Sequence, residues 1–195
     1  MMTRWWLKGS APGRAAPALA ALILAALVAL APPASALGDF SSWNNVATAA
    51  SQNKLDDVQT FLLKHSDPDA VDDQGRPALI WAVNYNNVAM IKLLLVHGAA
   101  ADHRDSFGDT ALHWAAQRGS TEAITLLING KATIDALNKQ GATPLMMAAG
   151  NGKSAAVRLL LAHGANPKLE DYTGRDARGW AAGKPAVLQI LAQAH

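Results

Sequence analysis

Apolar residues recur along the chain with a fixed step of 33 positions. Valine or isoleucine occupies Val58, Ile91, Ile124, Val157 and Ile190, and alanine occupies Ala49, Ala82, Ala115, Ala148 and Ala181. Within one step the apolar positions are three and four residues apart, as at Ile124, Leu127 and Ile128, which is the spacing of one helix face. The pattern predicts repeated pairs of short helices that bury their apolar faces by stacking on neighbouring pairs.

Polar residues and glycines repeat with the same step and mark the ends of these helices. The units open at Asp39, Asp72, Asp105, Asn138 and Asp171, and a glycine follows at Gly75, Gly108, Gly141 and Gly174, with Ser42 in the first unit. Thr110 and Thr143 precede the first helix of a unit as caps, and Pro144 suits a first helical turn. Gly119 and Gly152 suit the left-handed turn between the two helices.

Two of the units carry a recognisable motif. One reads DSFGDTALHWAAQRGSTEAITLLINGKATID from Asp105, and the next contains NKQGATPLMMAAGNGKSAAVRLLLAHGAN. These residues closely resemble the ankyrin repeat, whose pattern includes D-x-x-G-x-T-P-L-H-x-A-A, and the resemblance covers essentially all of residues 39–195. It implies an all-α ankyrin-repeat solenoid of helix-turn-helix units joined by β-hairpin-like loops. We place the units at 39–71 (an acidic N-terminal cap), 72–104, 105–137, 138–170 and 171–195 (a C-terminal cap).

Residues 1–36 have the layout of a secretory signal peptide. A start with three basic and no acidic side chains precedes the apolar run 18–31 and the small-x-small pattern of residues 34–36. The apolar run is shorter than the roughly 20 residues that span a bilayer. We therefore expect an exported protein, periplasmic in a Gram-negative bacterium, with no membrane association after cleavage. Secretion, or retention at the inner membrane by an uncleaved anchor, are the alternatives.

The charge of the chain changes once this leader is set aside. Three of the 17 basic side chains lie in the leader, which leaves 14 basic against 15 acidic residues and removes the main support for a nucleic-acid partner. The charge is unevenly distributed, because residues 39–73 hold seven Asp and two Lys, whereas residues 74–195 hold twelve basic and eight acidic side chains. Such a distribution can orient a charged partner. The absence of cysteine suits an exported protein that folds without disulfides.

Several residues raise the question of chemistry, and His113 is the first of them. It stands at the histidine of the TPLH motif, where the resemblance implies hydrogen bonds that tie neighbouring units together, and no cysteine or activated serine lies at a recognisable spacing from it. His97 and His163 belong to the helix ends two units apart, so they do not converge on one metal ion. Residues 150–154 (GNGKS) lack the first glycine of a phosphate-binding loop. We expect a non-catalytic protein without metal or cofactor.

The resemblance implies that a partner protein docks on the hairpin tips and on the exposed side of the first helices. Carried over unit by unit, these positions hold Gln74, Arg76, Asn84, Tyr85, Phe107, Asp109, Trp114, Gln117, Arg118, Gln140, Asn151 and Tyr172. For Phe107, packing on the neighbouring hairpin is the alternative. The column Trp81, Trp114, Met147 and Trp180 is either core or the floor of the concave groove.

The predicted function is therefore that of an exported protein-binding scaffold, monomeric on its own. Analogy with exported bacterial ankyrin proteins suggests support of a periplasmic or stress-defence enzyme. The alternatives are an immunity protein that inhibits a periplasmic toxin, a secreted effector, and a purely structural role in self-association.

Overall fold

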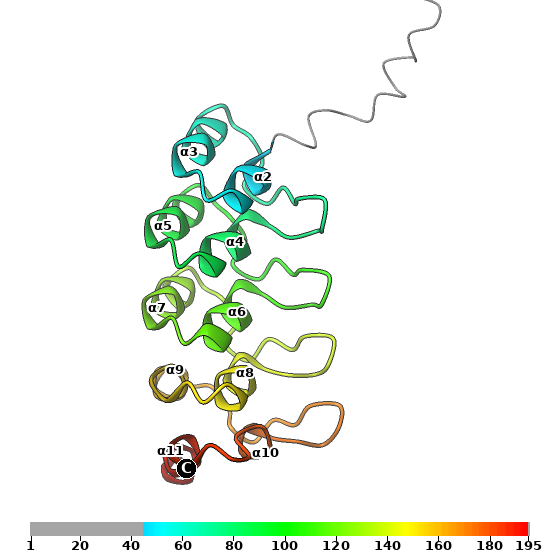
Figure 1. Cartoon of the computed structure of the whole chain (residues 1–195), viewed down its shortest axis with the longest axis vertical. Helices are drawn as coiled ribbons and strands as arrows, with labels where there is room; N and C mark the ends of the chain where they lie inside the picture. Colours follow the sequence, from blue (N-terminus) through cyan, green and yellow to red (C-terminus); the bar gives the residue numbers. More distant parts are fainter. Residues whose placement is uncertain (1–44, 195) are drawn as a thin grey trace, which may run out of the picture. The chain divides into compact units, whose positions relative to one another are not determined.

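A computed structural model describes residues 45–194, which fold into stacked pairs of short helices (Figure 1). The helices are α2 (Val46–Ser51), α3 (Leu55–Leu63), α4 (Ala78–Asn84), α5 (Val88–Val96), α6 (Ala111–Arg118), α7 (Thr121–Asn129), α8 (Pro144–Gly150), α9 (Ser154–Ala162), α10 (Ala177–Trp180) and α11 (Pro185–Gln193). The predicted signal peptide, residues 1–36, and the start of the first unit, residues 39–44, lie outside the described residues.

The helices form two parallel rows. Each inner helix (α2, α4, α6, α8, α10) contacts the inner helix of the next unit, and each outer helix (α3, α5, α7, α9, α11) contacts the next outer helix. The loops that lead from an outer helix to the next inner helix extend away from both rows (Figure 1). We call these loops the fingers; they comprise residues 64–77, 97–110, 130–143 and 163–176. Their only bridge of β type within residues 45–194 joins Val71 to Pro77.

The repeating alanines and branched residues form one continuous core between the rows. Ala82, Ala115 and Ala148 are fully buried on successive inner helices, where a larger side chain would push the helices apart. Ile124 and Val157 are fully buried on the outer helices. The core therefore runs through every unit and belongs to no single one.

The first residue of each unit closes the tip of its finger. Oδ1 of Asp105 accepts hydrogen bonds from the backbone N–H groups of Phe107 and Asp109 at 2.8 and 2.9 Å. Equivalent pairs of bonds reach the side chains of Asp72, Asn138 and Asp171. Gly108, in the same turn, has a φ of +79°, in the left-handed region that favours glycine. The repeating Asp or Asn and the repeating glycine are thus both required by one turn.

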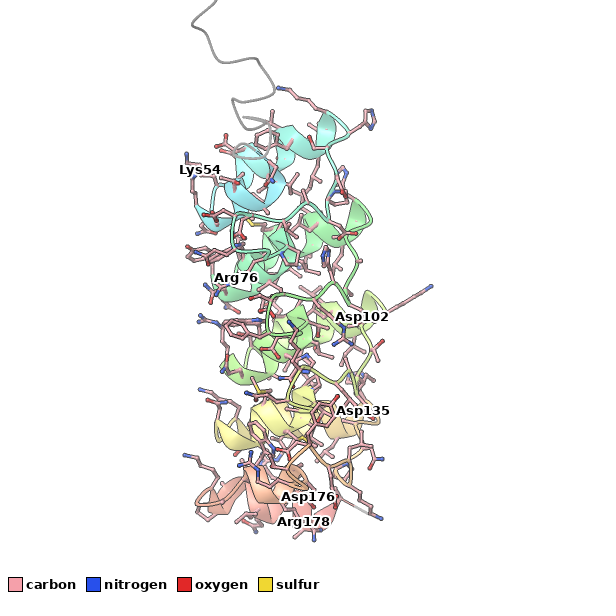
Figure 2. The ribbon with its side chains drawn as sticks, turned by 90° about the vertical axis from the view of Figure 1, so that its right-hand side faces the viewer. Lys54, Arg76, Asp102, Asp135, Asp176 and Arg178 are labelled. Carbon is pink, nitrogen blue, oxygen red and sulfur yellow. The ribbon has the colours of Figure 1, made fainter. Side chains whose placement is uncertain are left out.

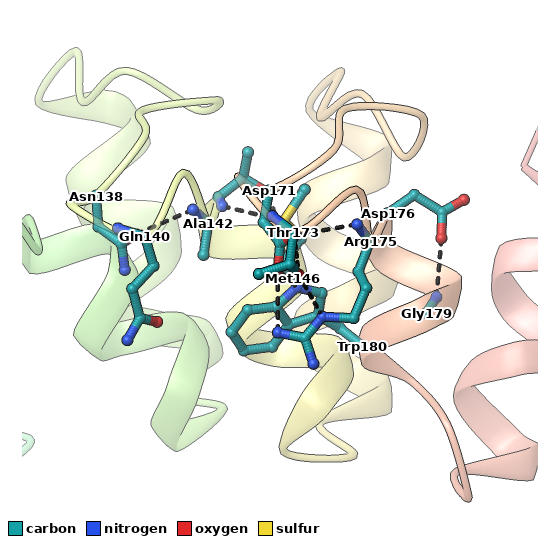
Figure 3. Close-up of polar contacts among 11 residues, drawn as sticks. Asn138, Gln140, Ala142, Met146, Asp171, Thr173, Arg175, Asp176, Gly179 and Trp180 are labelled. Atoms are coloured by element: carbon teal, nitrogen blue, oxygen red, sulfur yellow. Dashed lines mark hydrogen bonds and ion pairs between the residues drawn. The ribbon is translucent and has the colours of Figure 1, made fainter.

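The second carboxylate oxygen of this residue holds the tryptophan of the same unit. The indole N–H groups of Trp81, Trp114 and Trp180 donate to Oδ2 of Asp72, Asp105 and Asp171 at 2.6, 3.0 and 2.8 Å. In Figure 3, Asp171 lies between Trp180 and the tip residues Thr173 and Arg175. The hydroxyl of Thr173, bonded at 2.6 Å, is the main cause that lowers the pKa of the Asp171 carboxyl below its usual range.

The fourth unit departs from this pattern at both positions together. Met147 replaces the tryptophan, and Asn138 replaces the aspartate. The Nδ2 group of Asn138 instead donates to Oδ1 of Asp109, in the preceding finger, at 2.8 Å. The units that have a tryptophan thus have an aspartate that accepts from its indole N–H. The fourth unit has no tryptophan, and its asparagine donates to the carboxylate of the preceding finger.

A second set of aspartates links each finger to the next one, in the part of the finger that follows the outer helix. Asp69, Asp102 and Asp135 are again 33 residues apart, and each accepts a hydrogen bond from a backbone N–H of the next unit. The donors are Ala100, Thr133 and Asn166 at 2.8, 2.8 and 3.1 Å. Figure 2 shows Asp102 and Asp135 one above the other along the right-hand edge of the stack. These bonds fix the spacing of the fingers.

His113 joins the third and fourth units inside the core. Its ring is fully buried, its Nδ1 lies 3.2 Å from the N–H of Thr110, and its Nε2 lies 3.0 Å from the carbonyl oxygen of Ala142. Because a carbonyl only accepts, Nε2 carries the proton and Nδ1 accepts from Thr110. Burial is the main cause that lowers the pKa of His113 from its usual value. The prediction that this histidine ties neighbouring units together is confirmed.

The asparagine substitution Asp105→Asn tests the link between finger tip and tryptophan. It places an amide N–H₂ where Oδ2 accepts the Trp114 indole, so we expect the free energy of unfolding to fall by about 1–3 kcal/mol. In a Trp114→Met background the same substitution should lower the free energy of unfolding clearly less, because no indole N–H then needs the acceptor. The double variant copies the pair Asn138 and Met147 of the fourth unit. Urea denaturation of the wild type, both single variants and the double variant measures this coupling. Equal costs in the two backgrounds would contradict it.

The buried neutral state of His113 predicts a loss of stability in mild acid. Since the pKa of His113 is lowered in the folded state, the unfolded chain binds a proton that the folded chain excludes. The stability that comes from the neutral, buried His113 is fully present above the unfolded pKa of about 6.5 and is lost as the pH falls below it. The free energy of unfolding should therefore decrease between pH of about 7 and 5.5 in urea titrations.

Two variants separate His113 from the other histidines. His113→Met copies the residue at the equivalent position of the fourth unit, Met146; it should lower stability at neutral pH and flatten the pH dependence. His97→Gln removes an exposed histidine and should leave the wild-type slope unchanged. Burial raises the pKa of the nearby Asp109 carboxyl, so this group stabilises the folded state as the pH falls, opposite to His113. Its contribution is centred closer to the usual carboxyl pKa of 3.8, so the variants are compared above that range.

Candidate protein-binding surface

Ten of the twelve predicted partner-binding residues gather in two places on the surface formed by the fingers and the inner helices. The first place lies over units two and three, and we call it the arginine–tryptophan cluster: Arg76, Trp81, Asn84, Tyr85, Trp114 and Arg118. The second is a groove of about 420 Å³ over units three to five, which we call the Met147 groove. Its lining is Ser106, Phe107, Asp109, Gln117, Asn138, Lys139, Gln140, Met147, Asn151 and Trp180.

In the arginine–tryptophan cluster, one guanidinium lies against two indoles. The Cζ atom of Arg76 is 5.1 Å from the ring centroid of Trp81 and 5.7 Å from that of Trp114. Both distances are within cation–π range. The ring of Tyr85 stacks on Trp81 at a centroid distance of 6.0 Å, and its hydroxyl donates to the carbonyl of Ser51 at 2.7 Å. Successive units thus hold these side chains in a defined arrangement before any partner binds.

Arg118 extends the cluster toward the turns between inner and outer helices. Its guanidinium donates to Oδ1 of Asn84, at the end of α4, and the residue is exposed. Figure 2, which looks onto the fingers, places Arg76 and Lys54 along the left-hand edge of the stack. Lys54 lies in the turn between α2 and α3, so this edge carries the turns. The acidic links Asp102 and Asp135 lie on the opposite edge.

The Met147 groove exists because the fourth unit has smaller residues than its neighbours. Met147 stands where three other units have tryptophan, and Gly150 stands where units two and three have Asn84 and Gln117. A Cβ atom at Gly150 would lie 3.0 Å from Cε3 of Trp180, so the glycine lets this indole pack against α8. The tryptophan column is therefore both structural and accessible, since its rings are half-buried against the core and their edges line the surface.

The finger tips beside this groove are tied together by backbone hydrogen bonds. The N–H of Lys139 donates to the carbonyl of Phe107, and the N–H of Tyr172 donates to the carbonyl of Gln140, both at 3.1 Å. Residues Phe107 and Tyr172 are 59 % and 74 % exposed, so much of each side chain is accessible to a partner. Exposed aromatic side chains on a rigid support are typical of protein-binding surfaces.

The structure places the remaining predicted residues as follows. Gln74, Gln140 and Asn151 are exposed, and Asn84 and Gln117 are half-buried on the inner helices. The prediction for Asp109 needs correction. This residue is 8 % exposed and accepts the hydrogen bond of Asn138, so its carboxylate joins two fingers and is committed within the chain. The repeat pattern assigns Asp109 to a finger tip. It does not reveal the hydrogen bond to Asn138, because that bond depends on the asparagine found in the next unit.

Several residues that line the surface are not among the predicted partner-binding residues. The sequence left Met147 and Trp180 open as either core or groove floor, and the structure places both in the lining of the Met147 groove. Lys139 is exposed, and its ammonium group donates to the carbonyl of Ser106 at 2.8 Å. Lys153, in the GNGKS segment, lays its side-chain carbons against Gly119 of the preceding unit, where a Cβ would come within 2.9 Å of them.

The structure also bears on other chemical candidates. Among residues 45–194, no group of three His, Asp or Glu side chains is arranged to hold a metal ion. Across the same residues, every helix is too short or too polar to cross a membrane.

Comparison with known families agrees with this architecture. The three-copy ankyrin repeat family matches residues 46–138 and 131–195 of the chain. Together these segments cover well over half of the sequence, and the chain belongs to the ankyrin repeat family. Ankyrin repeats are protein-interaction scaffolds and are generally non-catalytic, so this is the class of protein that the fold and the surface define. No curated protein matches the chain.

The packing of the finger tips predicts a difference between two equivalent glycines. Gly141 and Gly174 have the same φ of +76°, so an alanine at either position costs about 1–2 kcal/mol in backbone strain. A Cβ atom at Gly141 would also lie 2.7 Å from Cδ1 of Tyr172 and 2.9 Å from its backbone nitrogen, whereas a Cβ atom at Gly174 meets nothing within 4 Å. Gly141→Ala should therefore lower the urea midpoint more than Gly174→Ala. Equal midpoints would show that the tips are not held together.

Proposed function

We propose that this protein is an exported, non-catalytic scaffold that docks a partner protein on its finger tips and concave face. The observation that carries the proposal is the preformed surface over units two to five. It combines exposed Phe107 and Tyr172, the half-buried indoles of Trp81 and Trp114, and a groove floored by Met147. Aromatic and arginine side chains on a rigid support lose little conformational freedom when a partner binds.

The rigidity of this surface has a structural cause that supports binding without rearrangement. Bonds from Asp or Asn side chains close each finger, bonds between tips join the last three fingers, and the indole N–H groups connect tips to inner helices. A protein partner therefore meets side chains whose positions are already determined. Such preorganisation lowers the entropic cost of association.

The proposed compartment is the periplasm, and it rests on the layout of residues 1–36. In that compartment the partner is an enzyme that the scaffold supports, for example one in stress defence. The alternatives make different predictions about the captured protein. An immunity protein would capture a toxin and abolish its activity, and a secreted effector would be recovered from the culture medium.

A double substitution tests whether the concave face binds. Phe107→Ala combined with Arg118→Ala removes one exposed ring and one exposed guanidinium, and we expect loss of partner capture with unchanged helical content and melting temperature. The measurement is a pull-down from the periplasmic fraction of the source organism, with residues 37–195 as bait, followed by identification of bound proteins. Circular dichroism verifies the fold.

The matched control is Val96→Ala combined with Arg158→Ala. These residues are also exposed, but they lie on the outer helices α5 and α9. The control should capture the same protein as the wild type. Capture that is lost in both double variants, or retained in both, would contradict docking on the finger and inner-helix side.

A further inference from the structure

The concave face, formed by the fingers and the inner helices, carries cations that form no ion pair with an acidic residue of the described part of the chain. Over residues 45–194 the ion pairs are Lys54–Asp57, His103–Asp69 and Arg175–Asp171. Arg76, Arg118, Lys153 and Lys184, which lie on or beside the concave face, take part in none of them. Residues 74–195 also hold twelve basic against eight acidic side chains. Part of the excess positive charge of these units therefore lies, without an ion pair, on the face that carries the arginine–tryptophan cluster.

Arg76 shows most clearly that a counter-charge is missing. Its side chain is half-buried against the rings of Trp81 and Trp114, and its Nε atom is buried with no hydrogen-bond partner in the described part of the chain. The equivalent residue of the last unit, Arg175, also lies over a tryptophan but bonds to Asp171 at 3.2 Å. Of these two arginines at the same repeat position, only Arg175 forms an ion pair, whereas Arg76 lies against a second indole, that of Trp114.

Further cations line the turns next to Arg118. The side-chain carbons of Lys153 lie against Gly119, and those of Lys184 lie against Gly152, so the two lysines follow Arg118 at successive units. The outer helices α7, α9 and α11 begin at these turns, and helix N-termini favour negative charge. Glu122, exposed in the first turn of α7, is the acidic residue of this row. The edge remains positive overall.

We propose that the arginine–tryptophan cluster and the adjoining turns bind an acidic peptide segment of the partner protein. Carboxylates of that segment pair with Arg76 and Arg118, and an apolar residue beside them enters the Met147 groove. Guanidinium groups bind carboxylates with two parallel hydrogen bonds, and neighbouring indoles exclude water from such a pair. This inference rests on the proposed function, because it names the chemistry of the partner for the same surface.

A peptide is favoured over a nucleic acid by the distribution of charge. Residues 37–195 have 14 basic and 15 acidic side chains, and the acidic first unit and the linking aspartates would repel an extended phosphate chain. Nucleic-acid affinity is carried by many phosphate contacts along a broad basic surface. The cluster offers instead a few localised cations beside aromatic rings, which suits a short segment with alternating acidic and apolar residues.

The test measures binding of fluorescein-labelled hexaglutamate to the protein by fluorescence anisotropy at low ionic strength. We expect saturable binding with one peptide per chain and an affinity that falls as salt is added. Arg76→Gln combined with Arg118→Gln should weaken binding by about tenfold or more. The control Lys92→Gln combined with Arg158→Gln removes the same charge from the outer helices and should change the affinity by less than about twofold.

Three outcomes would overturn the proposal: no saturable binding of hexaglutamate, an equal loss of affinity in both double variants, or tighter binding of labelled hexathymidylate than of hexaglutamate. Circular dichroism of each variant excludes unfolding as a cause. The result is distinguishable from failure of the proposed function. If a protein is captured through Phe107 but hexaglutamate does not bind, the scaffold proposal stands and only the acidic character of the partner is wrong.

Discussion

Every described unit of this protein buries its helices against its neighbours, because a pair of helices of four to nine residues has no interior of its own. Close approach of the inner helices requires the buried alanines Ala82, Ala115 and Ala148. The polar links follow from the same stacking: His113 bonds to Ala142 of the next unit, and Asp69 bonds to Ala100. The stack therefore determines both the core and the spacing of the fingers on which the binding surface is built.

The binding surface results from local variation on this regular frame. Where Asp105 accepts the indole of Trp114, the finger tip is joined to its own inner helix. In the fourth unit, Asn138 turns instead to the preceding finger, and Met147 leaves a groove in place of an indole. One pair of substitutions thus changes the connection between units and creates the space in which a partner side chain can lie.

Much of this fold follows from the sequence, and the reason is the local nature of its signals. The glycine and aspartate columns describe turns closed within five residues, as at Asp105 and Gly108, so their effect can be predicted from spacing alone. The role of His113 was predictable because the repeat assigns that position to a bond between units. Asp109 was misjudged for the opposite reason, since its partner Asn138 lies 29 residues away and differs from the residue found in other units.

The sequence by itself determined the repeat, the helix pairs, the finger turns and most of the positions that face outward. The tertiary structure decided which of those outward side chains are free and which are committed to a neighbour. Arg76 and Arg175 occupy the same repeat position, yet only Arg175 is paired with an aspartate. The physical reason is that the guanidinium of Arg76 also lies over Trp114 of the adjoining unit, whereas Arg175 pairs with Asp171 of its own finger. Contacts across units cannot be predicted from the spacing within one unit.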